Sequence, residues 1–461
     1  MKYERLRCGM ADPIVTEPVG DVDNPSAFSP NELGFMCGIE VHQQLATGKL
    51  HSRQPGVLYD VTIDTVPDLW PRFQRRLRAA RGEGGAIDVA ARFESRRNRS
   101  FVYVQSPNAG LIELDEQPPL PHDRDAVEIA LTVSALLEAK PVTMLQTMRK
   151  TVVDGSNTSG FQRTSLISVD GVLQTKTGPV GIDVLCLEED SARKLDTVST
   201  ANGEKVIYNL DRLGLPLIEI ATSPDVVSPE HAQETSKALG RCLRQTRKVR
   251  RGLGSIRQDL NVSLACGDRV EIKGCQDLSW IPRIIRLEMA RQLHFYRLAN
   301  ELRQSMDLPP LPPDRRLDDL SVEQEVSLSV HKRLPLVLED VSECFAACDS
   351  QMVKSGLDKG SVMLALPLPG LSGKFGVKAM DVEGAQMPRL GRELAGAAML
   401  AGVKGVFHSD ELPAYGIDLE QVNLVRIQLS LDDADGFVLC LAPQWQAELA
   451  LESVLDRARM A

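Results

Sequence analysis

The feature that most constrains this chain is a set of segments in which polar and apolar residues alternate with a period of two. In the segment 259–264, D-L-N-V-S-L, Asp259 and Asn261 alternate with leucine and valine. A period of two is typical of a β-strand, because successive side chains point to opposite faces. Similar alternation occurs in the segments 38–44, 184–190, 215–220 and 270–273. The pattern predicts a sheet with one apolar and one polar face.

The polar face of this predicted sheet carries an unusual choice of residues. Solvated strand positions usually favour Thr and Lys, whereas these strands place Glu40, His42, Glu219 and Asp259 between apolar neighbours. Carboxylates on one surface repel each other unless a cation lies among them, and Mg²⁺ bridging to nucleotide phosphates meets that demand. His42 suits Mn²⁺ or Zn²⁺ better than Mg²⁺, or it orients Glu40. The alternative is that this face is only the solvated side of an antiparallel sheet.

A turn rich in glycine and hydroxyl groups, D-G-S-N-T-S-G at 154–160, lies between two of these strands. Its backbone N–H groups around Ser156 and Asn157 could cradle a phosphate, with Arg149, Lys150 and Arg163 adding positive charge. The turn does not match G-x-x-x-x-G-K-[ST], so it is not a P-loop. A simple hairpin turn is the alternative interpretation.

Caps and apolar periodicity predict two helices between and after these strands. Ser228 is a good N-cap and Pro229 a good first-turn residue, followed by the apolar stripe Ala232, Leu239 and Leu243. A second helix is predicted from near Ser279, with Ile281, Ile285, Met289 and Leu293 on one face. The mixture predicts an α+β protein with a largely antiparallel sheet and flanking helices.

Composition shifts divide the chain into successive parts. The predicted division is a flexible N-terminal extension over 1–31, a first domain over 32–303, a proline-rich and acidic linker over 304–335, a smaller α+β domain over 336–441 and a terminal helix over 442–461. Within the last two parts, periodicity predicts a strand at 361–366 and helices at 388–401 and 446–460. A chain of 461 residues is too long for one ordinary core, so more than one domain is expected.

Composition also excludes several classes of protein. Hydrophobic residues make up 43% and charged residues 25%, which is typical of a globular protein and not of a disordered one. No apolar run approaches the roughly 20 residues that span a bilayer, so no membrane partner is expected. Nine cysteines without C-x-x-C spacing argue against a disulfide framework and for a reducing compartment, the cytoplasm.

The net charge of −10 excludes a general attraction to nucleic acid, and we expect no DNA partner. A local basic run remains as a candidate RNA-binding patch: Arg241, Arg244, Arg247, Lys248, Arg250 and Arg251. The alternative is a solvated helix face, and composition does not decide between the two.

Six segments in order resemble one known family. They are G-I-E-V-H-Q-Q-L from 38, M-R-K-T-V-V-D-G-S-N-T-S-G-F-Q-R-T from 148, L-E-E-D from 187, L-D-R-L-G-L-P-L-I-E-I from 210, R-G-L-G-S-I-R-Q-D-L-N-V-S from 251 and E-I-K-G-C-Q-D-L from 271. Together they closely resemble the family formed by the E-type subunit of archaeal glutamyl-tRNA(Gln) amidotransferases and its relative, the B-type subunit of the bacterial enzyme. The resemblance runs from about Gly34 to about Met460.

The resemblance implies a cradle domain over 32–303 with an ATP-dependent kinase site, using ATP and magnesium. The family phosphorylates the γ-carboxylate of glutamate mischarged on tRNA(Gln), and ammonia then displaces phosphate to give Gln-tRNA(Gln). This is the chemistry of a carbon–nitrogen ligase, a glutaminyl-tRNA synthase of the glutamine-hydrolysing class. The resemblance also implies a heterodimer in which an asparaginase-like partner, the D-type subunit, supplies ammonia. It further implies an insert over 336–441 similar to one in bacterial aspartyl-tRNA synthetases, best marked by 405–416.

Matching motifs carry the family's site residues onto this chain. The implied metal and phosphate site is formed by Glu40, His42, Glu189 and Asp259, and the implied catalytic set is these four with Lys273. The implied nucleotide-binding residues are Arg149, Lys150, Ser156, Asn157, Glu219 and Asn261.

Two departures from the family pattern leave alternatives open. Many relatives have cysteines where this chain reads K-L-H-S-R at 49–53, so a structural metal is not expected there. Relatives also continue past the insert into a helical domain and a tail that reach the tRNA, which this sequence is expected to lack. The alternative function is therefore a truncated, non-catalytic remnant that binds tRNA or a partner, and a third is an unrelated metal-dependent nucleotide hydrolase.

Overall fold

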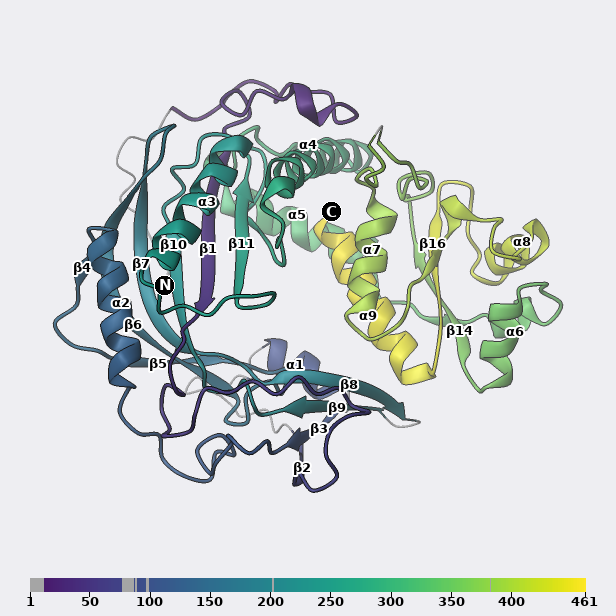
Figure 1. The fold of residues 1–461 in the computed structure, drawn as a ribbon. Helices are drawn as coiled ribbons and strands as arrows, with labels where there is room; N and C mark the ends of the chain where they lie inside the picture. The colour runs from purple at the N-terminus through teal and green to yellow at the C-terminus, as the bar shows by residue number, and fades with distance from the viewer. Residues whose placement is uncertain (1–11, 77–86, 88, 97–98, 201–202, 382) are drawn as a thin grey trace. The chain divides into compact units, whose positions relative to one another are not determined.

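The chain forms two compact units, seen in a computed structural model that describes residues 12–76, 87, 89–96, 99–200, 203–381 and 383–461 (Figure 1). The first unit comprises the described parts of 35–262 together with 269–285. The second unit comprises the described residues up to 34, then 263–268 and 286–461. In the part of the chain that the structure describes, no helix combines the length and the apolar character needed to cross a membrane.

The first unit is built on a large sheet with the strand order β12-β11-β1-β10-β7-β6-β4, and β5 pairs with β6 beside this path. The strands are β1 Met36–Gln44, β4 Lys140–Pro141, β5 Thr147–Thr151, β6 Phe161–Gln174, β7 Pro179–Glu189, β10 Pro216–Thr222, β11 Ile256–Ser263 and β12 Val270–Ile272. The pairs β1–β10, β10–β7, β7–β6 and β11–β12 are antiparallel. The predicted largely antiparallel sheet with flanking helices is confirmed.

A smaller sheet in the same unit has the order β2-β3-β9-β8. Its strands are β2 Arg72–Arg75, β3 Arg99–Val104, β8 Arg193–Thr200 and β9 Gly203–Asn209, and the short helix α1 spans Val89–Arg96. The pair β3–β9 is parallel, whereas β2–β3 and β8–β9 are antiparallel. Phe101, Tyr103 and Tyr208 are buried in the core on one side of this sheet.

Two helices cover the apolar face of the large sheet: α2 (Arg124–Leu136) packs on β6 and β7, and α3 (Pro229–Gln245) packs on β1. Ser228 caps α3 as predicted, because its hydroxyl accepts a hydrogen bond of 3.1 Å from the His231 N–H. The predicted stripe of Ala232, Leu239 and Leu243 is fully buried. The following elements are η2 Leu278–Trp280 and α4 Ile281–Ser305, whose predicted apolar face of Ile281, Ile285, Met289 and Leu293 is also fully buried.

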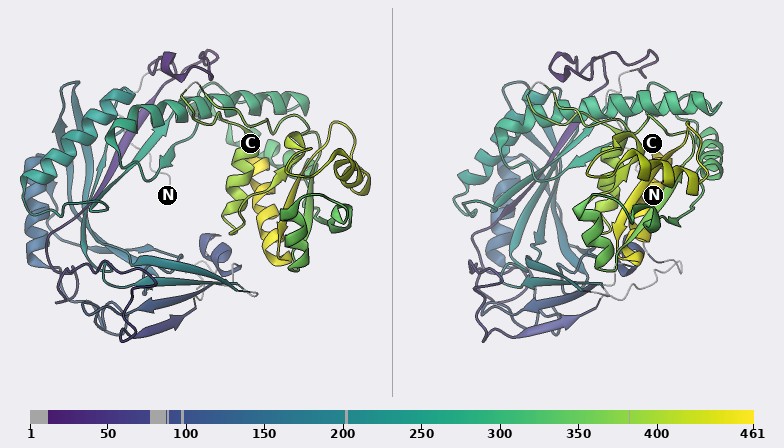
Figure 2. Two further views of the ribbon diagram at one scale, coloured as in Figure 1. Left: turned by 45° about the vertical axis from the view of Figure 1, so that its right-hand side comes forward. Right: turned by 90° about the vertical axis from the view of Figure 1, so that its right-hand side faces the viewer.

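The second unit contains its own sheet, in the order β13-β14-β16-β15 (Figure 2). Its elements are β13 Glu339–Asp340, α6 Gln351–Asp358, β14 Val362–Leu368, α7 Leu390–Met399, β15 Phe407–His408, α8 Leu419–Gln428, β16 Gly436–Ala442 and α9 Gln444–Met460. The core contains Phe345, Val353, Met363, Phe437 and Leu439. The predicted strand at 361–366 and helices at 388–401 and 446–460 correspond to β14, α7 and α9.

The segments predicted as a linker and as a flexible extension both contain defined structure. The helix α5 (Leu320–Arg333) lies within the stretch 304–335, and Asp319 caps it by accepting a hydrogen bond from the Ser321 N–H. In the extension, the Ile14 N–H donates to Asp314 at 3.0 Å and the Arg297 guanidinium donates to the Gly20 carbonyl at 2.9 Å. Residues 1–11 of that extension lie outside the described residues.

Candidate active site

The polar face of the large sheet collects carboxylates from neighbouring strands. His42 on β1 lies directly opposite Glu219 on β10, and Glu219 lies opposite Cys186 on β7. Directly opposed residues of antiparallel strands point to the same face, so these side chains form one row across three strands. We define the acidic face by six residues on this side of the sheet: Glu40, His42, Glu188, Glu219, Asp259 and Glu271.

His42 is the centre of the acidic face. Its Nε2 lies 2.9 Å from Glu40 and its Nδ1 lies 3.0 Å from Glu188, so both ring nitrogens contact a carboxylate. Burial opposes a charge on the ring, but the hydrogen bonds to Glu188 and Glu40 outweigh it and raise the pKa of His42 to about 9. The hydrogen bond to His42 also lowers the pKa of Glu40. A charged imidazole therefore joins two carboxylates.

Lys150 from β5 joins the row next to His42. Its Nζ lies 3.0 Å from Glu188 and 2.9 Å from Glu219, and its side chain is 47% exposed. Burial and the neighbouring Glu188 charge raise the pKa of Glu219 to about 7. Burial also disfavours the Glu188 carboxylate, but His42 and Lys150 outweigh burial and lower the pKa of Glu188 to about 2. Glu188 is therefore ionised at neutral pH, whereas Glu219 exchanges its proton near neutral pH.

A second group lies on β11 and β12. Lys273 donates to Asp259 at 3.3 Å and to Glu271 at 2.7 Å, and 68% of its side chain is exposed. Burial opposes the charge on Lys273, but the contacts with Glu271 and Asp259 raise its pKa. Asn261 lies opposite Glu271 in the β11–β12 register and shares the strand face of Asp259. This group extends the row of acids toward the edge of the sheet.

Two sets of side chains on the acidic face are spaced to hold a cation. The ligand atoms of Glu40, His42 and Glu219 all lie within 4.8 Å of one another, and so do those of Glu40, Asp259 and Glu271. Glu40 belongs to both sets. Four of the five residues in these two sets are carboxylates, and hard oxygen donors are the ligands that Mg²⁺ prefers. The carboxylates present therefore fit magnesium, whereas both nitrogens of the charged His42 ring are occupied by hydrogen bonds to Glu40 and Glu188.

Glu189, which the sequence motif assigned to the metal site, points away from the acidic face. Successive residues of a strand face opposite sides, so Glu189 lies on the side of β7 opposite to Glu188. The Arg163 guanidinium holds both of its oxygens, at 3.1 and 3.2 Å. Burial raises the pKa of Glu189 in spite of Arg163. The neighbouring Glu188 takes the place next to His42 that the motif gave to Glu189.

The glycine-rich turn lies with Glu189 and not with the acidic face. Asn157 and Glu189 line the same small cavity, and the Asn157 Oδ1 is buried without a hydrogen-bond partner among the described residues. Ser156 is also buried, and its carbonyl accepts a hydrogen bond from Ala192. Arg149 is exposed and lies over the Phe161 ring, 5.0 Å from its centroid. Of the predicted phosphate-binding residues in and beside this turn, Lys150 alone contacts the acidic face within the described part of the chain.

Three residues of this region were not predicted from the sequence: Glu188, Glu271 and a buried lysine. Strict alternation was the available signal for Glu188, because it places this residue opposite Leu185 and Leu187, which are fully buried. Lys49 is completely buried; its Nζ donates to the Leu210 carbonyl at 3.1 Å. Burial lowers the pKa of Lys49 to about 8. No periodic pattern in the sequence around Lys49 predicts its burial.

Comparisons with known proteins identify similar chains. Residues 35–331 match the model of the GatB/GatE catalytic domain. Proteins named as the E-type subunit of glutamyl-tRNA(Gln) amidotransferase are 43% identical over 431 residues in Pyrococcus furiosus, 40% over 432 residues in Methanopyrus kandleri and 40% over 438 residues in Methanosarcina acetivorans. The matches cover 93–94% of this chain and 62% of each relative. The chain thus spans about 62% of the length of these relatives.

Proposed function

The chain belongs to the GatB/GatE catalytic-domain family, and from this premise we propose that it is the kinase and transamidase subunit of a glutamyl-tRNA(Gln) amidotransferase. The proposed reaction converts Glu-tRNA(Gln) to Gln-tRNA(Gln) in two steps. A γ-carboxylate oxygen of the esterified glutamate attacks the γ-phosphorus of ATP, and the bond to the bridging oxygen of ADP breaks. Ammonia then attacks the activated carbonyl carbon, phosphate leaves, and a proton is released from the nitrogen.

The acidic face is the observation that carries this proposal. Phosphoryl transfer needs positioning and charge neutralisation more than covalent chemistry from the protein. We propose that Glu40, Glu219, Asp259 and Glu271 hold magnesium, and that His42 orients Glu40 and Glu188 through its two hydrogen bonds. Magnesium bound there would neutralise charge on the ATP phosphates. Several carboxylates close together repel one another, and a bound cation relieves this repulsion. The acidic face is therefore suited to bind magnesium.

Two lysines on this face are suited to contact phosphate. Lys150 and Lys273 each contact a pair of carboxylates through the ammonium group, yet about half or more of each side chain stays exposed. A partly exposed ammonium group can exchange a carboxylate for a phosphate oxygen while it stays in contact with water. We propose that Lys150 binds the nucleotide and that Lys273 neutralises charge during transfer.

The finer parts of the proposal concern partners and the second unit. We propose that an asparaginase-like partner, the D-type subunit, supplies ammonia and that the two proteins form a cytoplasmic heterodimer. We also propose that the segment 336–441 corresponds to the insert similar to that of bacterial aspartyl-tRNA synthetases. The sheet β13-β14-β16-β15 with its own helices supports a separate folding unit at this position.

The test is the transfer of labelled phosphate from γ-labelled ATP to Glu-tRNA(Gln), with the asparaginase-like partner present and without an amide donor. We expect label on the aminoacyl-tRNA, and conversion to Gln-tRNA(Gln) with release of the labelled phosphate once ammonium chloride is added. Binding of Glu-tRNA(Gln) without any transfer of label would favour the alternative function, a non-catalytic tRNA-binding protein.

A further inference from the structure

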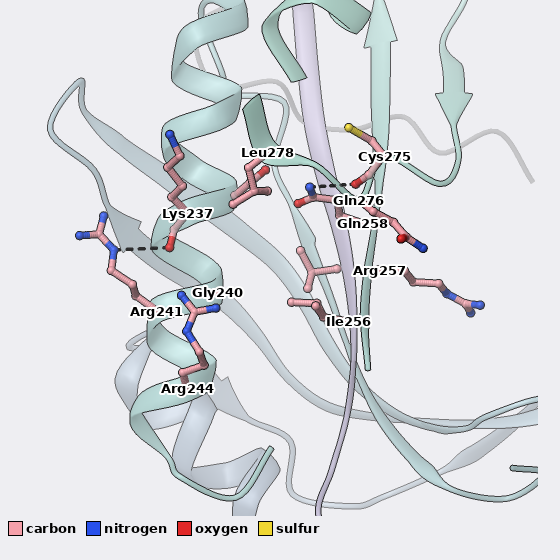
Figure 3. Close-up of a pocket in the computed structure, with 12 residues that line it drawn as sticks. Lys237, Gly240, Arg241, Arg244, Ile256, Arg257, Gln258, Cys275, Gln276 and Leu278 are labelled. Atoms are coloured by element: carbon pink, nitrogen blue, oxygen red, sulfur yellow. Dashed lines mark hydrogen bonds between the residues drawn. The ribbon is translucent and has the colours of Figure 1, made fainter. Parts of the chain in front are cut away.

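A cavity of about 400 Å³ lies beneath the C-terminal half of α3, on the side of the large sheet opposite to the acidic face (Figure 3). Val41 from β1, Ile256 from β11 and Leu278 from η2 provide apolar walls. Val41 alternates with Glu40 and His42 along β1, which places it on the opposite side of the sheet. The volume falls in the range of small-ligand sites, so the cavity is large enough for one planar ring with its substituents.

The cavity is held open by the absence of a side chain at Gly240. The three atoms nearest to a Cβ at this position would be guanidinium atoms of Arg244, at 3.1 to 3.8 Å, and the flexible end of this side chain can move away. Glycine in the interior of a helix costs about 1 kcal/mol relative to alanine, so α3 is less stable than it would be with this space filled. Figure 3 shows Arg244 beside Gly240 at the helix side of the cavity.

A buried polar group in the wall lacks a partner. Ser236 lines the cavity; its Oγ is buried beneath the wall and has no hydrogen-bond partner among the described residues, and the residue is only 4% exposed. A helical serine usually donates to the carbonyl one turn earlier, and an unpaired buried hydroxyl is unfavourable. Gln258 contributes a second polar side chain, and its Nε2 donates to the Cys275 carbonyl at 3.0 Å (Figure 3). Rotation of the Ser236 side chain toward the cavity would let a ligand with polar edge atoms pair with this hydroxyl.

The surface around the cavity is strongly cationic. The segment 235–258 contains eight Lys and Arg residues and no Asp or Glu, in a chain whose net charge is −10. Arg250 is held by the protein itself, because it donates to the carbonyls of Leu45 and Gly56. The other seven are exposed or partly exposed, and within the described residues none has an ion pair with a carboxylate: Lys237, Arg241, Arg244, Arg247, Lys248, Arg251 and Arg257.

We propose that this cavity receives one unpaired nucleotide of a bound RNA, while the exposed cations of α3 and of the loop after it bind the flanking phosphates. The inference rests on the proposed function, which supplies the RNA. The apolar walls accept the faces of a base, and Ser236 and Gln258 lie where they can reach its polar edge. The Arg244 guanidinium at the helix side can stack on a base, as arginine does in single-stranded RNA recognition.

Two observations favour RNA over an acidic protein segment. Five of the seven cations are arginines, whose planar guanidinium groups pair with phosphate through two hydrogen bonds. The cations also lead toward the acidic face: Arg257 shares a strand face with Asp259 on β11, and its charge acts on His42. Arg257 therefore places one of the seven cations on the acidic face, where the proposed function puts the esterified glutamate.

The central test compares the binding of a labelled oligoadenylate RNA with that of an abasic ribose-phosphate chain of equal length, by fluorescence anisotropy. Wild type should bind the RNA roughly tenfold more tightly than the abasic chain, the size of one base–aromatic or base–guanidinium stack. Gly240→Leu projects a side chain into the cavity and should bind both chains equally, at the affinity of the abasic one. Gly396→Leu in α7, where a Cβ would meet no atom within 4 Å, is the matched control and should keep the preference.

A second pair of variants separates the phosphate contacts from the base pocket. Lys237→Gln with Arg241→Gln should weaken both chains and reduce the slope of log affinity against log salt by about 1.4, the value for two lost contacts to a single strand. Lys332→Gln with Lys359→Gln, two exposed lysines of the second unit, should leave both quantities unchanged. Ser236→Ala, a helix-stabilising change, should reduce the preference for RNA about threefold if the larger leucine proves too disruptive.

Equal binding of RNA and abasic chain by the wild type would overturn the proposal, as would an unchanged preference in both Gly240→Leu and Ser236→Ala. Competition by polyglutamate as effective as that by RNA would also overturn it, in favour of an acidic protein segment. The outcome is independent of phosphoryl transfer: a normal base preference without any phosphate transfer to Glu-tRNA(Gln) would refute the proposed function alone.

Discussion

Two adjacent glutamates on β7 occupy opposite environments. Glu188 faces the acidic face, where His42 and Lys150 each approach it to 3.0 Å and Glu219 competes for the same lysine. Glu189 faces the other side, where the Arg163 guanidinium holds both its oxygens. The same type of side chain thus belongs to a crowded group of acids at one position and to a buried ion pair with an arginine at the next.

The difference indicates which carboxylates are free to change partners. On the acidic face, negative groups outnumber positive ones and the lysines are partly exposed, so a ligand can replace existing contacts. Glu189 and Arg163 form an ion pair in which both side chains are nearly buried, and removing either one leaves an uncompensated charge. We therefore propose that the acidic face binds the ligand and that the pair of Glu189 and Arg163 contributes to stability.

The largest expected effect comes from the residue shared by both cation sets. Glu40→Gln keeps the size of the side chain but removes the charge that both sets require, and it should lower the rate of phosphate transfer to Glu-tRNA(Gln) about 10³-fold. Single-turnover transfer with saturating ATP measures this rate. Glu128→Gln, an exposed glutamate on α2, is the matched control and should retain the full rate.

The second prediction separates the two sides of β7. Glu189→Gln should lower the free energy of unfolding by about 2 kcal/mol, because Arg163 is left buried without its counter-charge. The variant should still bind ATP with wild-type affinity once folded. Urea unfolding and equilibrium dialysis of ATP measure the two quantities. Intact stability combined with lost ATP binding would return Glu189 to the metal site predicted from the sequence.

The third prediction concerns Lys150. Lys150→Ala should raise the Michaelis constant for ATP roughly tenfold, since one charge-assisted phosphate contact is lost. Lys140→Ala provides the comparison, because Lys140 forms an exposed pair with Asp170 and should leave the constant unchanged. If Lys150→Ala and Lys140→Ala had the same Michaelis constant for ATP, Lys150 would not be part of the nucleotide site.

The smallest effect is a pH dependence of stability. The pKa of Glu219 is raised from 4.5 to about 7 in the folded protein, so the folded state binds more protons between these values. Its contribution to stability is therefore present below pH 4.5 and lost as the pH rises through 7. The quantity to measure is the melting temperature of Glu219→Gln minus that of wild type, without magnesium. We expect this difference to be roughly 2 °C larger at about pH 8 than at about pH 5.

Magnesium provides the matching half of that experiment. At about pH 8 it should raise the melting temperature of wild type by about 3 °C, because the ion binds only the folded state. The rise should shrink at about pH 5 and in Glu219→Gln, while sodium chloride of equal ionic strength should not reproduce it. A magnesium effect that is equal at both pH values and in both proteins would place the ion elsewhere.

The sheet and its polar face were predictable because period-two alternation is a direct consequence of strand geometry. The Ser228 cap and the buried stripe of α3 were predictable for the same kind of local reason. The helix α5 was not predictable, because Val326 is its only buried residue among those described and its polar sequence follows a run of prolines. Its place depends on tertiary contacts such as the ion pair of Arg303 with Glu323.

The choice between Glu188 and Glu189 shows where a motif misleads. The resemblance places L-E-E-D in the site, and we assigned its second glutamate, Glu189, to the metal. Alternation along the strand decides between the two glutamates. Glu189 shares a face with the buried Leu185 and Leu187, and Glu188 lies on the opposite face. Lys49 was beyond prediction, because its burial results from contacts between residues distant in the sequence, such as Leu210.

Binding of Mn²⁺, followed by its paramagnetic resonance signal, tests the central claim most directly, because it reports on the acidic face without requiring tRNA or turnover. We predict that wild type binds Mn²⁺ in competition with Mg²⁺, that Glu40→Gln weakens binding at least about tenfold, and that Glu189→Gln binds as tightly as wild type. Binding that is lost in Glu189→Gln and retained in Glu40→Gln would contradict this claim and would place the metal on the other side of β7.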